Sequence, residues 1–216
     1  MSDYRRWLVP GATYFFTVVT YQRRLILGSE EAVRLLSDVM REVRKNLPFH
    51  TIAMVVLPDH IHCVWSLPPD DLDFSTRWKK IKREFTVHWV ALNERQPSVS
   101  SSRRFKGERG VWQRRFWEHL VRDEAGLEHC CDYIHYNPVK HGYAASPGDW
   151  PWSTFARFVQ SGDYPPDWGR HMPNSLSKEL PMGEIGVGRT DWFRPLPPPN
   201  RAGGFPAHGS PVSGLV

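Results

Sequence analysis

Two apolar segments separated by only two residues are the feature that most constrains the fold of this chain. Residues 49–57 (FHTIAMVVL) and 60–67 (HIHCVWSL) are rich in β-branched and aromatic side chains, and Pro58-Asp59 lies between them. Such composition favours strands, and a Pro-Asp pair between strands is typical of a tight turn. The pattern predicts an antiparallel hairpin, which any fold proposed for this chain has to contain.

The segments on either side of the hairpin complete an α+β pattern. Strand-like composition alternates there with apolar residues that recur at helical spacing. The predicted elements are a strand at 13–21, a helix from 29 to 47, a helix at 75–93, a long strand at 111–122 and a helix at 124–137, which Pro138 is expected to end. The order matches a ferredoxin-like split βαβ fold: a four-stranded antiparallel sheet with an added C-terminal helix.

The length and composition indicate one core followed by a tail. A chain of 216 residues can bury a single sizeable core. We expect a domain over 1–169, closed by a short helix near 152–159, and a flexible tail over 170–216, which is rich in Pro and Gly. Three cysteines cannot build a disulfide framework, and no segment resembles a leader or a membrane span. A cytoplasmic protein fits these features best.

His60 and His62, in the third predicted strand, are candidate metal ligands. Residues two apart in a strand share a face, so the two imidazoles can bind one divalent ion. The chain holds ten histidines. At that frequency chance alone gives about half a His-x-His pair, so the pair fits two histidines on an exposed strand equally well.

The last predicted helix carries a tyrosine and an asparagine one turn apart. Its apolar residues form a stripe at the 100° step of an α-helix, and Tyr133 and Asn137 lie along the edge of that stripe. A phenol can act as a nucleophile, and an amide oxygen can bind a metal ion. The alternative is that Tyr133 completes the core and Asn137 caps the helix.

Other candidates near this helix are less well placed. Tyr136 points away from the apolar stripe and is expected to face solvent. His119, in the fourth strand, could lie near a metal ion but is more often a structural residue. His129, His135 and His141 fall on different faces of the helix, which argues against a second metal site.

Five segments spread over residues 4–169 carry a family resemblance. They are PDHIHCVW (58–65), WKKIKREFTVHW (78–89), WQRRFWEHLVRDE (112–124), YIHYNPVKHG (133–142) and WPWSTF (150–155). Together and in this order they resemble the REP-associated tyrosine transposases, bacterial relatives of the IS200/IS605 single-strand transposases. The resemblance implies that His60 and His62 form the HUH metal motif and that Tyr133 is the catalytic nucleophile. It also implies that Asn137 replaces a glutamine as third metal ligand. Because the side chain of Asn is shorter than that of Gln, Asn137 is expected to bind the metal more weakly or through a water molecule.

The resemblance also implies an activity and a substrate. Such an enzyme cuts single-stranded DNA, keeps a 5′-phosphotyrosine link and releases a 3′-OH that can rejoin. The substrates implied are hairpins of repetitive extragenic palindromes (REP), read in single-stranded form. Mg²⁺ or Mn²⁺ is the expected cofactor because phosphate oxygens are hard ligands, although imidazoles also accept Zn²⁺.

Basic residues interleaved with aromatic ones are candidate DNA contacts. The net charge of +5 gives only weak support for a polyanionic partner. Basic residues on a helix are also often just a solvated face, and many of the aromatic residues belong to the core. The candidates are Arg5, Arg6, Lys79, Lys80, Lys82, Arg83, Arg114, Arg115 and Arg122, near Trp78, Trp112, Phe116 and Trp117.

Two other functions stay open at this point. A replication-initiator HUH nuclease would use the same histidines and tyrosine chemistry, but the segments after the tyrosine argue against it. A ferredoxin-like sheet bearing aromatic residues can also bind RNA or a palindrome without cutting it. For the oligomeric state, the resemblance favours a monomer over a homodimer, with the tyrosine helix docked on its own sheet.

Overall fold

The computed structural model of the chain describes residues 8–93, 99–105 and 107–177. Its strands are β1 (Thr13–Val19), β2 (His50–Leu57), β3 (His60–Ser66) and β4 (Trp117–Val121). They form one four-stranded sheet of order β2-β3-β1-β4, and all pairs are antiparallel. This is the strand order of the ferredoxin-like fold, so the predicted fold class is confirmed.

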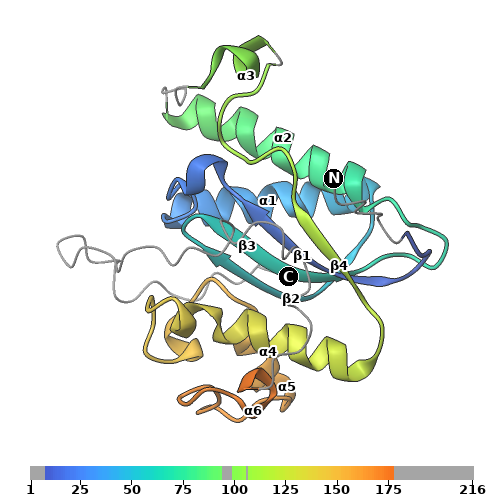
Figure 1. Ribbon diagram of the computed structural model, residues 1–216, viewed down its shortest axis with the longest axis vertical. Coiled ribbons are helices and arrows are strands. Elements are labelled where there is room, and N and C mark those ends of the chain that lie inside the picture. The colour runs from blue at the N-terminus through green and yellow to red at the C-terminus, as the bar shows by residue number, and fades with distance from the viewer. Residues whose placement is uncertain (1–7, 94–98, 106, 178–216) are drawn as a thin grey trace.

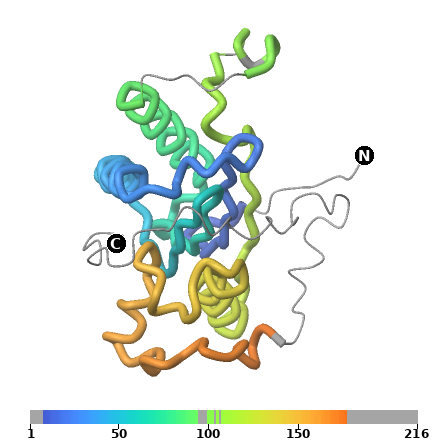
Figure 2. Tube along the Cα trace, turned by 90° about the vertical axis from the view of Figure 1, so that its left-hand side faces the viewer, coloured from blue at the N-terminus to red at the C-terminus, as the bar shows by residue number. Residues whose placement is uncertain are grey.

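Helices cover both faces of the sheet. They are α1 (Glu30–Asn46), α2 (Phe74–Asn93), α3 (Ser101–Phe105), α4 (Glu124–Lys140), α5 (Phe155–Ser161) and α6 (Asn174–Ser177), with 3-10 turns η1 (Tyr21–Arg23) and η2 (Pro147–Asp149). Helices α1 and α2 lie on one face and α4 on the other (Figures 1 and 2). Helix α4, which follows the last strand, therefore forms a separate layer.

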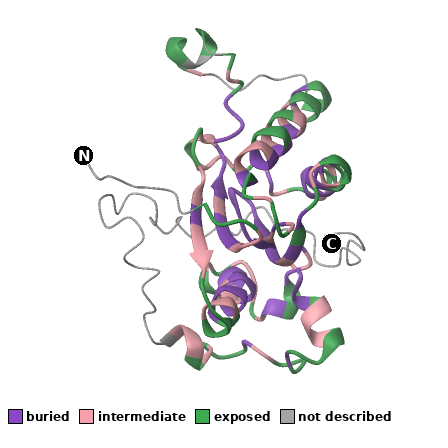
Figure 3. Ribbon diagram, turned by 90° about the vertical axis from the view of Figure 1, so that its right-hand side faces the viewer, coloured by how far each residue is buried: buried purple, intermediate pink, exposed green. Residues whose placement is uncertain are grey.

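Alternation along β3 explains the two faces. Trp65 points to the first face, where its ring stacks on Trp78 of α2 with centroids 4.3 Å apart. His60 and His62 have the opposite parity and point toward α4. Helices cover both faces of β3, whose residues are nearly all buried, and Figure 3 shows the inner strands of the sheet buried between the helix layers. The histidines are therefore not on an exposed strand face.

The hairpin forms as predicted. Leu57 pairs with His60 across the two-residue turn. The carbonyl of Asp59 accepts hydrogen bonds from the backbone and side chain of Thr20, at 2.9 Å each. These bonds tie the turn to the end of β1.

The fourth strand is shorter than the predicted strand over 111–122. Only Trp117–Val121 pairs with β1, while Trp112 makes an isolated bridge to Thr20. The ammonium of Lys82 donates hydrogen bonds to the carbonyls of Gln113 and Arg114, which draws this stretch toward α2 and away from the sheet. A tertiary contact thus overrides local strand propensity.

The tyrosine helix is longer than predicted, because it continues through Pro138 to Lys140. Proline lacks only its own N–H, so it removes one bond of the helical ladder. The ladder resumes directly, with the His141 N–H donating to the Asn137 carbonyl at 3.0 Å. The extra turn carries Lys140 and His141 along the sheet.

The folded chain also continues beyond the predicted limit at Gly169. Helix α6 packs on α4, where Ser175 Oγ donates to Asp132 at 2.5 Å and the Ser175 carbonyl lies 3.1 Å from His129 Nδ1. The first part of the predicted tail, 170–177, thus contacts α4 in the described structure, and its remainder, 178–216, lies outside the described residues. Within the described helices, none is long and apolar enough to cross a membrane.

Candidate active site

His60 and His62 lie side by side on β3, facing α4. Their ring centroids are 4.8 Å apart and the rings are nearly perpendicular. Both residues are buried, with 3% and 2% of their surface exposed. Two imidazoles two residues apart on one strand face are thus held together by the backbone of the central strand.

The carboxylate of Asp59 fixes the ring of His60. Its Nδ1 lies 2.6 Å from Oδ1 of Asp59, whose other oxygen accepts from Arg23 at 2.6 Å. The Asp59 side chain is fully buried, and the His60 and Arg23 contacts outweigh that burial and lower its pKa. With Nδ1 directed at a carboxylate, His60 presents Nε2 to the site, which is the arrangement common in metal-binding histidines.

His62 has a neutral partner instead. Its Nδ1 lies 2.9 Å from the hydroxyl of Thr17, which pairs with it across the β1–β3 ladder. Burial holds the pKa of His62 well below its ordinary value, and the nearby His60, His141 and Lys140 act in the same direction. His62 is therefore neutral, as a metal ligand must be.

The structure brings Tyr133 next to His62. The two ring centroids are 5.2 Å apart, and the Tyr133 ring also meets the edge of Phe15 at 5.9 Å. Burial raises the pKa of the phenol. The amide of Asn137 lies close to the hydroxyl and partly offsets this effect, although the two groups form no hydrogen bond of standard geometry.

Asn137 is a fully buried amide without a partner. It has 0% of its surface exposed, and among the described residues neither Oδ1 nor Nδ2 has a hydrogen-bond partner. An unpaired buried amide costs about 1–3 kcal/mol, so such a group calls for a ligand. Within the described residues no three His, Cys, Asp or Glu side chains form a metal-binding group. The unpaired amide oxygen of Asn137 is a candidate ligand in addition to the two histidines.

Two further residues approach the site from the extra turn of α4, and sequence reasoning missed both. The ring of His141 lies 5.4 Å from that of His60, and Lys140 Nζ lies 4.8 Å from the centroid of the Tyr133 ring. Burial lowers the pKa of His141 to about 4. The spacing 133, 137, 141 repeats every four residues and could have revealed His141. The expected helix end at Pro138 hid it.

The other histidines and Tyr136 have structural surroundings. His119 lies on the α4 face of the sheet but stacks on Trp117, and β1 separates its strand from β3. His135 is buried against Thr154, with Nε2 2.9 Å from the hydroxyl. The prediction that Tyr136 faces open solvent is wrong. It is half-buried, with its ring next to the backbone of Gly169.

The basic residues predicted to contact DNA do not gather around the histidines. Arg5 and Arg6 lie outside the described residues. Lys82 is half-buried and holds the carbonyls of Gln113 and Arg114. The remaining six are exposed, on α2 or next to β4: Lys79, Lys80, Arg83, Arg114, Arg115 and Arg122.

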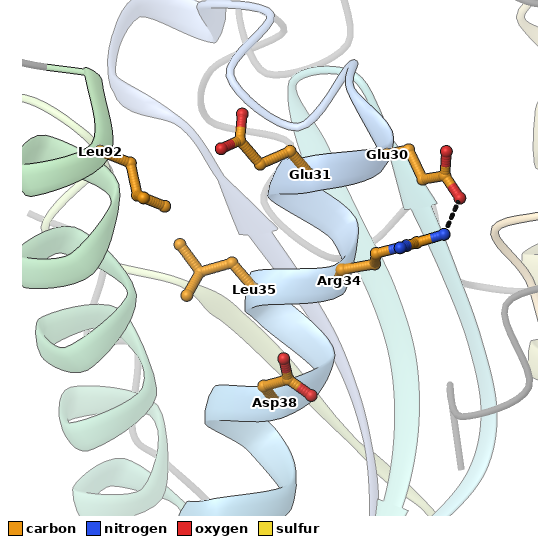
Figure 4. Close-up of a pocket in the computed structure, with 6 residues that line it drawn as sticks. All are labelled: Glu30, Glu31, Arg34, Leu35, Asp38 and Leu92. Atoms are coloured by element: carbon orange, nitrogen blue, oxygen red, sulfur yellow. Dashed lines mark hydrogen bonds and ion pairs between the residues drawn. The ribbon is translucent and has the colours of Figure 1, made fainter.

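A shallow pocket between α1 and α2 lies far from these groups, on the other face of the sheet. Figure 4 shows three acidic side chains there, Glu30, Glu31 and Asp38, with the apolar Leu35 and Leu92. Its negative side chains would repel a phosphate backbone. The buried histidine–tyrosine cluster is therefore the candidate active site.

Comparisons with known proteins give the family of the chain. The family model described as "Transposase IS200 like" matches residues 9–137, a segment that contains both histidines, Tyr133 and Asn137. The REP-associated tyrosine transposase of Escherichia coli (strain K12) is 43% identical over 168 residues, which cover 78% of this chain and 91% of that protein. A relative of the same kind from Haemophilus influenzae is 41% identical over 169 residues, 78% of this chain and 94% of its own.

A solved structure shows the same likeness in three dimensions. It is a REP-associated tyrosine transposase bound to a REP hairpin, 39% identical, with a TM-score of 0.65. The match covers 81% of this chain and 94% of that one. Taken with the fold and the histidine–tyrosine cluster, these findings show that the chain belongs to the IS200-like transposase family, among the REP-associated tyrosine transposases.

Proposed function

We propose that this chain is a metal-dependent endonuclease and strand transferase that cuts single-stranded DNA beside a REP hairpin. The observation that carries the proposal is the approach of Tyr133 on α4 to His62 on β3, with ring centroids 5.2 Å apart. A phenol nucleophile beside paired imidazoles supports phosphodiester cleavage. The substrate class is carried over from the related transposase that was solved with a REP hairpin.

The residues of the site fit a divalent metal ion. The Nδ1 atoms of His60 and His62 are directed at Asp59 and Thr17, so both Nε2 atoms remain for a ligand. The unpartnered amide of Asn137 supplies a carbonyl oxygen. When bound to these three residues, Mg²⁺ or Mn²⁺ would draw negative charge from the phosphate oxygens.

Tyr133 then performs the covalent step. Its phenol loses a proton to solvent, and the Oη atom attacks phosphorus in line with the bridging 3′ oxygen. The O–P bond forms, the P–O3′ bond breaks, and the 3′ oxygen takes up a proton from water. The 5′ phosphate remains on Tyr133, and because one phosphodiester replaces another, a 3′-OH can attack the adduct and restore or exchange the strand.

The DNA-binding surface includes exposed basic side chains outside the cleavage site. Those next to β4, Arg114, Arg115 and Arg122, lie along an edge strand of the sheet. Arginines on such an edge can bind phosphates of a hairpin stem whose single-stranded foot reaches Tyr133. Lys79, Lys80 and Arg83 extend the positive surface onto α2.

A single chain contains every group that the reaction uses. Tyr133 contacts His62 of the same chain, and Asn137 follows one turn later on the same helix. No second copy is needed to complete the site, so we propose that the protein cuts as a monomer.

The test is adduct formation on a single-stranded oligonucleotide that carries a REP hairpin and flanking single strands, with Mn²⁺ or Mg²⁺. One sample is labelled at its 3′ end and another at its 5′ end. Attack as proposed sends the 3′ label onto the protein and the 5′ label onto a shorter free strand. Attack of opposite polarity would reverse the two labels.

Two tyrosine variants test the assignment of the nucleophile. Tyr133→Phe keeps the ring and removes the attacking oxygen, so the covalent band should disappear. Tyr136→Phe is the matched control, because Tyr136 packs next to Gly169 and should retain most activity. An adduct that persists in Tyr133→Phe and vanishes in Tyr136→Phe contradicts the assignment, and wild-type protein that never forms an adduct contradicts the proposed function.

A further inference from the structure

Lys140 lies where α4 continues past Pro138, two helical turns after Tyr133. Residues seven apart in a helix differ in direction by only about 20°, so the two side chains share a face. Lys140 Nζ lies 4.8 Å from the centroid of the Tyr133 ring. A cation at this distance from an aromatic face is attracted to it.

In the described structure, titratable groups from β3, η1 and α4 interact with Tyr133. His62 of β3 is neutral, since burial holds its pKa well below the ordinary value. Arg23 of η1, whose charge lowers the pKa of the phenol, is ion-paired with Asp59 at 2.6 Å. Within the described chain, Lys140 of α4 forms no ion pair. Lys140 therefore adds, next to the Tyr133 ring, a positive charge that has no carboxylate partner within the described chain.

The proposed reaction needs a positive charge at this position. As the O–H bond of Tyr133 breaks and the O–P bond forms, negative charge passes from the phenol oxygen to the phosphate. Burial raises the pKa of the phenol, and Phe15 lies at one edge of the ring. Negative charge in such surroundings is costly unless a cation lies close by.

We propose that Lys140 is the charge partner of Tyr133: its ammonium stabilises the negative charge on the phenol oxygen during attack on phosphorus. The role rests on the proposed function and adds no bond change to it. Lys140 acts through Tyr133 and is thus a positioning residue, distinct from the metal ligands. It is not a phosphate contact that holds the hairpin.

The competing explanation is that the aliphatic stem of Lys140 merely covers the Tyr133 ring. Two variants separate charge from packing. Lys140→Met keeps most of the stem and removes the charge, whereas Lys140→Arg keeps a permanent charge. Lys45→Met is the matched control, because Lys45 is exposed on α1 and pairs only with Glu42 in the described structure.

The experiment measures single-turnover adduct formation at saturating REP hairpin with Mn²⁺, together with hairpin affinity. In Lys140→Met we expect the rate to fall about 100-fold, as for loss of one charge-stabilising group in an active site, while hairpin affinity stays close to that of wild type because no phosphate contact is lost. Lys140→Arg should recover most of the rate, and Lys45→Met should match wild type.

Three outcomes overturn the proposal. They are a wild-type rate in Lys140→Met, a loss of hairpin affinity with an unchanged rate at saturation, and failure of Lys140→Arg to recover activity while it folds normally. A substrate with sulfur at the bridging 3′ position gives a fourth test, because a thiolate leaves without taking up a proton. If it restores the rate of Lys140→Met, the ammonium serves the leaving group instead. Absence of any wild-type adduct refutes the proposed function and is recognised separately.

Discussion

Replacing Asp59 by Asn tests whether the contacts of Asp59 with His60 and Arg23 support metal binding. The carboxylate makes two contacts of 2.6 Å, one to Nδ1 of His60 and one to Arg23. An amide has one accepting oxygen, so it can keep only one of them and turns an N–H toward the other partner. Because the Asp59 side chain is fully buried, solvent cannot take over the lost bond.

The size of the effect follows from these contacts. A hydrogen bond to a charged group contributes about 1.5–3 kcal/mol, and breaking a buried ion pair on one side costs about 3–5 kcal/mol. We therefore expect the free energy of unfolding to fall by about 2–4 kcal/mol. A lost orienting carboxylate lowers metal affinity about 10- to 100-fold, so Mn²⁺ should bind correspondingly more weakly.

The assay is a calorimetric Mn²⁺ titration of folded protein at neutral pH, with urea unfolding measured alongside. Asp38→Asn is the control, because Asp38 pairs with Arg41 at a similar 2.7 Å but on the exposed surface of α1. A surface pair contributes about 0–1 kcal/mol and should leave Mn²⁺ binding unchanged. A folded Asp59→Asn protein that binds Mn²⁺ as tightly as Asp38→Asn would refute the reasoning.

Three further predictions follow from buried groups around α4. Asn137→Ala should weaken Mn²⁺ binding about tenfold without lowering stability, because the amide has no partner to lose; calorimetry and urea unfolding check both, and unchanged Mn²⁺ binding counts against the third ligand. Burial lowers the pKa of His135 to about 3. The unfolded chain then binds a proton that the folded chain does not, so the unfolding free energy falls by up to about 1.4 kcal/mol per pH unit from about pH 6.5 toward 3. His135→Gln should flatten that slope in urea unfolding at pH 6.5 and 5, and an identical slope contradicts the assignment. A chain ending at Gly169 should melt several degrees below one ending at Ser177, since it lacks the bonds to Asp132 and His129; equal melting points would show that α6 adds no stability.

Local periodicity sufficed for most of the fold. The hairpin around Pro58, the strand β1 and the helix that begins after Ser29 each show their pattern within one segment, and Ser29 caps α1 as its residue type favours. The limits of β4 and α4 were not readable in the same way. The first depends on Lys82, which comes from another helix, and the second on how little Pro138 disturbs the ladder.

The site shows the same division. Strand and helix periods put His60 and His62 on one face, and Tyr133 and Asn137 on one edge, but they do not say that these faces meet. The residue type of Asp59 predicts a turn. Its contacts with His60 and Arg23 appear only in the structure, where η1 brings Arg23 to it. Thr17 is coupled to His62 by the register of β1 against β3, which no local pattern fixes.

The segment after the tyrosine helix has a structural task that its motif does not disclose. Along the β2 edge, the Thr154 N–H donates to the Met54 carbonyl and the Val56 N–H to the Trp152 carbonyl, each at 2.9 Å. The hydroxyl of Thr154 also meets His135 of α4. His135 lies two residues from Tyr133 and therefore on the far side of the helix. The WPWSTF segment thus joins the sheet edge to the back of α4, so the distance between Tyr133 and the histidines depends on residues outside the histidine–tyrosine cluster.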